Sequence, residues 1–175
     1  MREALFGLIV LGGLSLAAAA AAQTQQQIDW CYADSATDDQ TIEGCTAMIQ
    51  SGRYQGVELA NAYNNRAAGY NGKRQLELAI QDDLLAIQLN PLNAQAFHNL
   101  GDDYYAKSNF DTAITDYTRA LAIKPDYAKA YLGRAKTYEQ KGLRDAAIAD
   151  YRSAMQYSLT QAEARAGLIR LGQTP

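Results

Sequence analysis

The sequence predicts an all-α fold in which antiparallel helix pairs stack into a solenoid. The main observation is a fixed period, because Tyr63, Phe97 and Tyr131 stand at equal intervals and the small and aromatic positions around them repeat with the same spacing. Such a period is typical of a stacked helical array, since one helix pair cannot bury its apolar face without neighbours. Short turn-forming segments also divide every copy into two helix-length halves, and prolines end the first two copies.

The first half of each copy predicts an amphipathic helix, called helix A. Tyr63 stands one turn before Ala67, and Tyr70 follows three residues later, so these side chains share one stripe. The other copies hold Phe97, Gly101, Tyr104 and Tyr131, Ala135, Tyr138 at the same positions. Small residues let helix backbones approach closely, and the aromatic rings fill the remaining gaps.

The second half of each copy predicts another helix, called helix B. Its buried stripe holds recurring alanines, namely Ala79, Ala113, Ala147, Ala86, Ala120 and Ala154. The segments between A and B are 71–73, 107–109 and 140–142, too short for anything except an antiparallel hairpin. Pro91 and Pro125 predict the ends of the first two B helices, whereas Leu159 replaces proline in the third, whose helix is expected to end less sharply.

This repeat resembles the tetratricopeptide repeat (TPR) family, with copies over residues 60–93, 94–127 and 128–161. The second copy matches the family pattern at Phe97, Leu100, Gly101, Tyr104, Ala113, Tyr117, Ala120 and Pro125. The resemblance implies a right-handed TPR solenoid whose A helices line a concave groove, the usual peptide-binding face of the family.

Charged residues replace apolar ones at several positions of that pattern. Arg66 and Arg134 stand where leucine is usual, and Asp83 stands where an aromatic residue is usual. We expect Arg66 to pair with Asp82 or Asp83, and Arg134 with Asp150, because a buried charge without a partner is costly. A catalytic carboxylate is the alternative, but we interpret these residues as ion pairs that join the helices of a hairpin.

Length and composition agree with one small repeat domain. The chain has 175 residues, is 48% hydrophobic and contains 3 prolines, enough for one array but not for a second large domain. Its formal net charge of -3 provides no basic patch. Nucleic acid is therefore not an expected partner.

The segment 1–22 predicts a secretory signal peptide. An apolar run over residues 4–16 leads into alanines that end at Ala22, before Gln23. An uncleaved membrane anchor is the alternative, but Gly12-Gly13 and the alanine-rich end favour cleavage. A lipoprotein is not expected, because no cysteine lies close behind the apolar run. We expect a periplasmic or secreted protein, without stable membrane insertion after cleavage near Ala22.

The two cysteines, Cys31 and Cys45, lie in a segment that predicts an N-terminal cap. Residues 23–59 resemble a degenerate helical hairpin, and the terminal unit of a solenoid has only one neighbour. An oxidising compartment favours a disulfide, which would compensate for the missing contacts. Metal binding lacks further cysteine or histidine ligands, and a redox Cys-x-x-Cys spacing is absent. We therefore predict a structural disulfide and neither metal nor cofactor. At the other end, residues 162–175 predict a C-terminal capping helix.

The motifs of an active site are missing from the sequence. His98 is the only histidine, and Asp102 follows it by one helical turn, but no nucleophile or oxyanion motif accompanies the pair. A phosphate loop, a nucleophile elbow and a metal-ligand cluster are also absent from the sequence. We interpret the chain as noncatalytic and His98 as a surface or groove residue.

Function is then expected from the A-helix positions outside the buried stripe. The predicted partner-binding residues are Asn61, Asn64, Gln95, His98, Asn99, Asp102, Tyr105, Lys129, Leu132 and Lys136. They predict a groove that is amide-rich at one end and cationic at the other, suited to a peptide backbone and to a carboxylate. The alternative is that they are only solvated polar positions.

The comparison with the carboxylate clamp of chaperone-binding TPR domains fails in part. Asn99 and Lys129 match two positions of that clamp, but Asn64, Ala68 and Gly133 occupy the others. The predicted function is a noncatalytic scaffold or adaptor for a peptide segment or an envelope protein. A self-associating structural subunit, or an accessory part of a cell-wall enzyme system, is the alternative.

Overall fold

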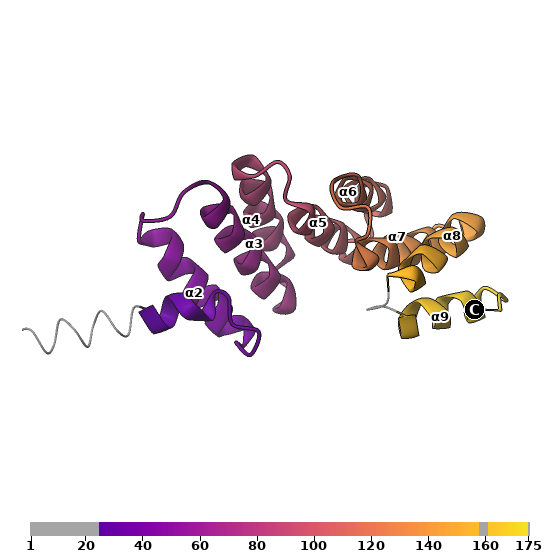
Figure 1. Cartoon of the computed structure of the whole chain (residues 1–175), viewed down its shortest axis with the longest axis horizontal. Coiled ribbons are helices and arrows are strands. Elements are labelled where there is room, and N and C mark those ends of the chain that lie inside the picture. Colours follow the sequence, from indigo (N-terminus) through magenta and orange to yellow (C-terminus); the bar gives the residue numbers. More distant parts are fainter. Residues whose placement is uncertain (1–24, 158–160, 175) are drawn as a thin grey trace, which may run out of the picture.

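The computed structural model describes residues 25–157 and 161–174, which are helical apart from short connections. The predicted signal peptide and Leu159 lie outside these residues. Figure 1 shows the helices following one another in chain order along the long axis of the molecule. The all-α array of antiparallel helix pairs is therefore confirmed.

Each copy of the repeat forms one helix pair. The pairs are α3 (Gly56–Gly72) with α4 (Leu76–Leu89), α5 (Ala94–Ala106) with α6 (Phe110–Ile123), and α7 (Ala128–Gln140) with α8 (Arg144–Gln156). Helix α3 begins ahead of the boundary predicted at residue 60. The flanking helices are α2 (Asp38–Gln50) and α9 (Gln161–Arg170).

The three hairpin turns share one backbone geometry. Arg74, Ser108 and Gly142 occupy the same repeat position and have φ values of 62°, 59° and 71°. In each turn the following amide donates to a carbonyl in the last turn of helix A, as Asn109 N does to Tyr104 O at 2.8 Å. This pattern ends a helix through one left-handed residue, a conformation that favours glycine. The first turn lies slightly later than predicted, over residues 73–75.

Local signals explain where several helices begin and end. Thr37 and Gln40 form a reciprocal capping box at the start of α2, and the Asn93 side chain accepts from Ala96 N at 3.1 Å at the start of α5. Pro91 and Pro125 follow the ends of α4 and α6, as predicted, because proline cannot continue a helix.

The core combines alanines with a few large rings. The predicted alanines of the A and B helices are fully buried, and Tyr117 and Tyr151 fill the spaces between successive pairs. Tyr117 lies directly against Gly133 of the next copy, where an added Cβ would stand 2.6 Å from its ring. Gly167 of α9 has the same relation to Tyr151. Glycine is required at both positions by this close approach.

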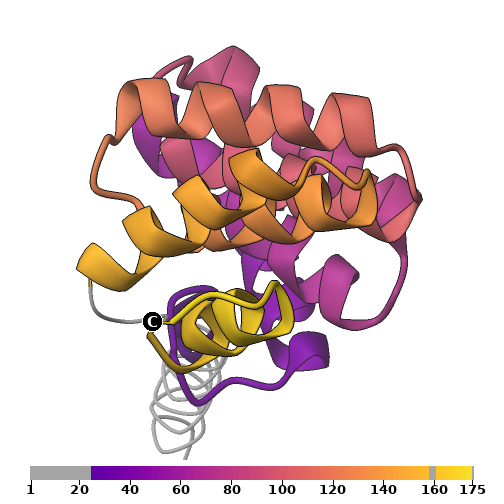
Figure 2. The ribbon, with the colours of Figure 1, turned by 90° about the vertical axis from the view of Figure 1, so that its right-hand side faces the viewer.

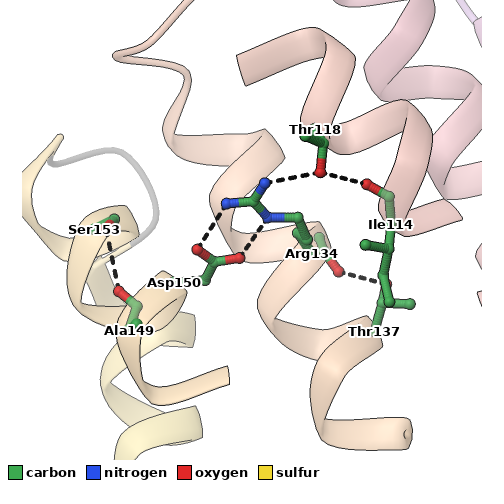
Figure 3. Close-up of polar contacts among 8 residues, drawn as sticks. Ile114, Thr118, Arg134, Thr137, Ala149, Asp150 and Ser153 are labelled. Carbon is green, nitrogen blue, oxygen red and sulfur yellow. Dashed lines mark hydrogen bonds and ion pairs between the residues drawn. The ribbon is translucent and has the colours of Figure 1, made fainter. Parts of the chain in front are cut away.

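The two predicted ion pairs across the helical hairpins are confirmed. Arg134 donates from Nε and Nη2 to Asp150 at 2.7 and 3.0 Å, and Arg66 makes the same two bonds with Asp82 at 2.7 and 2.9 Å. Figure 3 shows that Arg134 also reaches Thr118 on the preceding helix, α6. Each arginine therefore joins three helices.

A disulfide closes the N-terminal cap. Cys31 and Cys45 are bonded, with their Cα atoms 4.6 Å apart, and both are buried beside Ile28 and Met48. Helical residues 25–30 pack directly on α2 at Gly44, where a Cβ would collide with the backbone of Gln27. The bond therefore reinforces the packing of this short helical segment on α2.

Reducing this disulfide is expected to lower the free energy of unfolding by about 3 kcal/mol, the chain-entropy value for a loop of this length. Urea denaturation with and without a thiol reductant measures the effect. A Cys31→Ser/Cys45→Ser variant should have the same urea midpoint as the reduced wild type, and adding the reductant should not change that midpoint. Equal midpoints for the oxidised and reduced wild type would contradict a stabilising role.

Helix α9 caps the C-terminal end of the array. Figure 2 views the molecule from this end and shows α9 beside α8. Ala164 and Leu168 are buried against the third copy, while Arg170 pairs with Glu139 of α7 at 2.9 Å. Along residues 25–157 and 161–174, no helix has both the length and the apolar character needed to cross a bilayer.

Candidate functional site

A cavity of about 490 Å³ opens between the A helices α5 and α7 and the capping helix α9. Six of the predicted binding residues line it: His98, Asp102, Tyr105, Lys129, Leu132 and Lys136. Asn71, Arg74, Tyr117 and Glu163 lie on the same walls. These ten residues define the A-helix groove.

The other four predicted binding residues do not line this groove. Asn61 and Gln95 are exposed elsewhere on their helices. Asn64 is buried and donates from Nδ2 to Asp83 Oδ1 at 2.7 Å, and Asn99 is half-buried near the same carboxylate. The amide side chains predicted for one end of the groove are therefore either exposed outside it or packed between helix pairs.

Aromatic packing holds His98 in the groove wall. Its ring is tilted against Tyr127 at 5.1 Å between centroids and meets Tyr117 edge-on at 5.9 Å. His98 Nδ1 lies 3.7 Å from Asp102 Oδ2, beyond hydrogen-bond distance, and 3.4 Å from Asn99 Oδ1. The arrangement shapes the groove, and the described lining residues include no serine, threonine or cysteine.

A tyrosine–carboxylate bond forms the floor of the groove. Tyr117 Oη donates to Asp102 Oδ1 at 2.6 Å. Burial and the nearby charge of Asp102 raise the pKa of Tyr117 well above its usual value, so the phenol stays protonated and remains a donor. Asp102 keeps its second oxygen, Oδ2, on the side of His98. The floor therefore has one fixed acceptor within an otherwise aromatic surface.

The rim of the groove is mainly cationic. Lys136 pairs with Glu163 at 2.5 Å, and this bond lowers the pKa of Glu163. Within residues 25–157 and 161–174, Lys129 and Arg74 are exposed and have no ion-pair partner. The rim can therefore attract a negative group while Tyr105 and Leu132 offer apolar contact.

Sequence reasoning missed four residues of the groove. Tyr117 was identified only as a position of the repeat pattern; it is buried in the core, yet its hydroxyl end reaches the groove floor. Glu163 follows Lys129 by one full period, so the repeat register itself placed it on this face once α9 continues the array. Asn71 and Arg74 lie at the end of α3 and in its turn, where the period gave no signal for a groove position.

Comparison with known proteins identifies the repeat. A TPR repeat model matches residues 101–142, and a tetratricopeptide repeat model matches residues 128–160. The chain therefore contains TPR repeats over residues 101–160. No curated protein sequence matches it significantly.

Solved TPR structures share its fold. The Arabidopsis OM64 TPR domain is 26% identical, with a TM-score of 0.64, and the alignment covers 66% of this chain and 96% of that domain. The crystal structure of MamA is 28% identical, with a TM-score of 0.60 and coverage of 72% and 71%. The second TPR domain of human RPAP3, solved with the HSP70 peptide SGPTIEEVD, is 20% identical, with a TM-score of 0.59 and coverage of 64% and 93%. At that identity the RPAP3 likeness concerns the fold alone.

Proposed function

We propose that this TPR protein is a noncatalytic scaffold that holds an extended peptide segment of a partner protein in the A-helix groove. The observation that carries the proposal is the groove itself, a cavity of about 490 Å³ with a fixed aromatic floor and a cationic rim. TPR domains bind peptides, and those of RPAP3 were solved with HSP90 and HSP70 peptides. The common fold supports the same mode of binding here.

The chemistry of the rim favours a segment that carries an acidic group. Lys129 and Arg74 are exposed. Lys136 forms an exposed ion pair with Glu163, and a carboxylate of the bound segment can compete with Glu163 for it. Asn64 and Ala68 do not supply the remaining positions of the chaperone clamp, and Asn64 is engaged with Asp83. The preferred segment therefore differs from a chaperone tail in how its carboxylates are placed.

We also propose that the protein is exported and acts in the cell envelope. The apolar stretch and alanines before Gln23 support a cleaved signal. The Cys31–Cys45 disulfide supports the same compartment, because disulfides persist where the environment is oxidising. A partner in the envelope follows from this location.

Charge reversal at Lys129 tests the groove. In fluorescence-polarisation titrations with a panel of extended peptides bearing acidic residues, Lys129→Glu is expected to weaken binding at least tenfold. The physical reason is the loss of a charge-assisted bond, worth about 1.5 to 3 kcal/mol, and its replacement by repulsion.

Arg53→Glu is the matched control, because Arg53 is exposed in the loop before α3 and lies outside the groove. It changes the net charge equally and should bind within twofold of wild type. Equal affinities of the Lys129 and Arg53 variants for every bound peptide would show that the peptides do not bind in the A-helix groove.

A further inference from the structure

Two of the three copies share a buried arginine bridge. In copies one and three, the helix A arginine donates two bonds to an aspartate of its own helix B. Its third nitrogen, Nη1, donates to a threonine of the preceding helix, from Arg66 to Thr46 at 3.2 Å and from Arg134 to Thr118 at 2.9 Å. The bridge therefore needs an aspartate, an arginine and a threonine from three successive helices.

Aromatic rings flank the guanidinium in both bridges. Arg66 Cζ lies 5.5 and 5.8 Å from the ring centroids of Tyr63 and Tyr70. Arg134 Cζ lies 5.8 and 5.9 Å from those of Tyr131 and Tyr138. Rings at this distance attract a guanidinium. The aspartate and two rings together thus make a receptor for an arginine side chain.

The second copy keeps this receptor but lacks the arginine. Asp116, Phe97 and Tyr104 occupy the positions of the aspartate and the two rings, in the same repeat register as their counterparts. Leu100 replaces the arginine and Leu84 replaces the threonine. The second copy fits the TPR pattern best. It is also the copy whose aspartate lacks the arginine that pairs with the corresponding aspartate in the other two copies.

Asp116 is buried with a weak substitute partner. It is 3% exposed, and among the described residues its only ion pair is with Arg119, whose Nη1 lies 3.3 Å from Oδ1. The Arg119 side chain is 60% exposed and comes from the next turn of the same helix. Its Cζ also lies 5.8 Å from the Phe97 ring centroid, so a second guanidinium has to displace it from this ring. Burial raises the pKa of Asp116, although the charge of Arg119 opposes this shift. Asp82 and Asp150 each receive two bonds instead of one.

An open cavity leads to this carboxylate. It has a volume of about 450 Å³ and lies between the B helices α4 and α6, over one face of α5. Phe97, Leu100, Tyr104 and Asp116 line it, and Leu84, which is 51% exposed, stands at its edge. We call it the Asp116 cavity. It shares no lining residue with the A-helix groove.

We propose that the Asp116 cavity binds an arginine side chain of a partner protein, whose guanidinium takes the place that Arg66 and Arg134 take in the other copies. The carboxylate accepts two parallel bonds from the planar guanidinium while Phe97 and Tyr104 flank it. Lysine fits less well, because its ammonium is a strongly hydrated point charge that cannot form the paired bonds. An apolar residue beside the arginine would cover Leu84. The partner protein would therefore present an exposed arginine next to an apolar side chain.

The test uses N-acetyl-arginine-methylamide as the probe and NMR of the Leu84 and Leu100 methyl groups as the readout. We expect saturable shifts with the arginine probe, and binding at least tenfold weaker with the lysine analogue and with the neutral citrulline analogue. Asp116→Asn should remove the saturable shifts, whereas Lys129→Glu in the A-helix groove should preserve them. Equal binding of the arginine and citrulline probes, or no saturable shift, would overturn the proposal.

Restoring the missing bridge provides a second measurement. Leu84→Thr/Leu100→Arg rebuilds the bridge of copies one and three within the chain, so it should raise the thermal midpoint and abolish probe binding. Because this variant lacks both leucines, probe binding to it and to wild type is followed by the methyl groups of Ile87, which also lines the cavity. Arg119→Gln removes the competing side chain and should strengthen probe binding. Wild-type affinity in the rebuilt variant, or loss of binding in Arg119→Gln, would contradict the proposed site. Since the Lys129 variant addresses peptide binding separately, failure of this site and failure of the scaffold function remain distinguishable.

Discussion

Replacing Arg134 with alanine is expected to lower the free energy of unfolding by about 3 to 5 kcal/mol, the usual cost of leaving a buried charge unpaired. Asp150 would lose both of its bonds while only 9% of its side chain is exposed. The link to Thr118 would disappear at the same time, loosening the contact of α7 with α6 (Figure 3). Urea denaturation at pH 7 measures the change.

Two controls separate this effect from general damage to the helix. Arg134→Ala/Asp150→Ala should recover part of the loss, because no unpaired carboxylate remains at this position in the interior. Lys136→Ala, in the exposed pair with Glu163 on the same helix, should cost much less, since exposed ion pairs contribute little. If the Arg134 and Lys136 variants have equal stability, the bridge does not hold the array together.

The second large effect concerns the junction between the first two copies, which is polar where the later junctions are aromatic. Asp83 and Asp103 are fully buried, and one carboxylate oxygen of each has no hydrogen-bond partner among the described residues. Asn64 donates to Asp83, and Asn71 donates to Asp103. Burial raises the pKa of Asp83 well above its usual value and that of Asp103 to about 6.

Which residue fits at position 83 depends on the residue that faces it from the next helix. Tyr117 and Tyr151 stand at the position of Asp83 in the later copies, and each packs on a glycine of the following helix, Gly133 and Gly167. Asn99 occupies that glycine's position at the first junction. A Cβ at Gly133 would stand 2.6 Å from the tyrosine ring, so a ring at position 83 has no room beside Asn99.

Asp83→Tyr alone is therefore expected to lower the free energy of unfolding by about 3 kcal/mol, through overpacking and the loss of the Asn64 acceptor. Adding Asn99→Gly should recover about 2 kcal/mol of that loss, because it opens the space that the later copies already have. A thermodynamic cycle of the two single variants and the double variant measures this coupling. Additive effects would show that the two positions do not determine each other.

The same cycle has a defined pH dependence. The pKa of Asp83 is raised in the folded state, so its contribution is most favourable when it is protonated, at and below about pH 4, and is lost as the pH rises through its folded pKa. The double variant lacks this carboxyl group. Its stability relative to wild type should consequently increase as the pH rises above about 4.

Some contacts were predictable because both partners lie within one repeat. Arg134 and Asp150 belong to one helical hairpin, and a buried arginine needs a carboxylate, so the pair followed from the pattern. The disulfide followed from two cysteines in one short segment. The sequence placed Asn64 in the groove, whereas in the structure its amide donates to the buried Asp83. Helical spacing alone cannot show this contact.

By itself, the sequence determined the all-α repeat, its helix pairs and both caps, because period, turn chemistry and small residues act within one copy and its immediate neighbour. Only the tertiary structure decided which polar residues face solvent, a groove or another carboxylate, because each such position depends on three helices together. Thr118 completing the Arg134 bridge, and Leu100 leaving Asp116 without one, are both consequences of how adjacent copies stack.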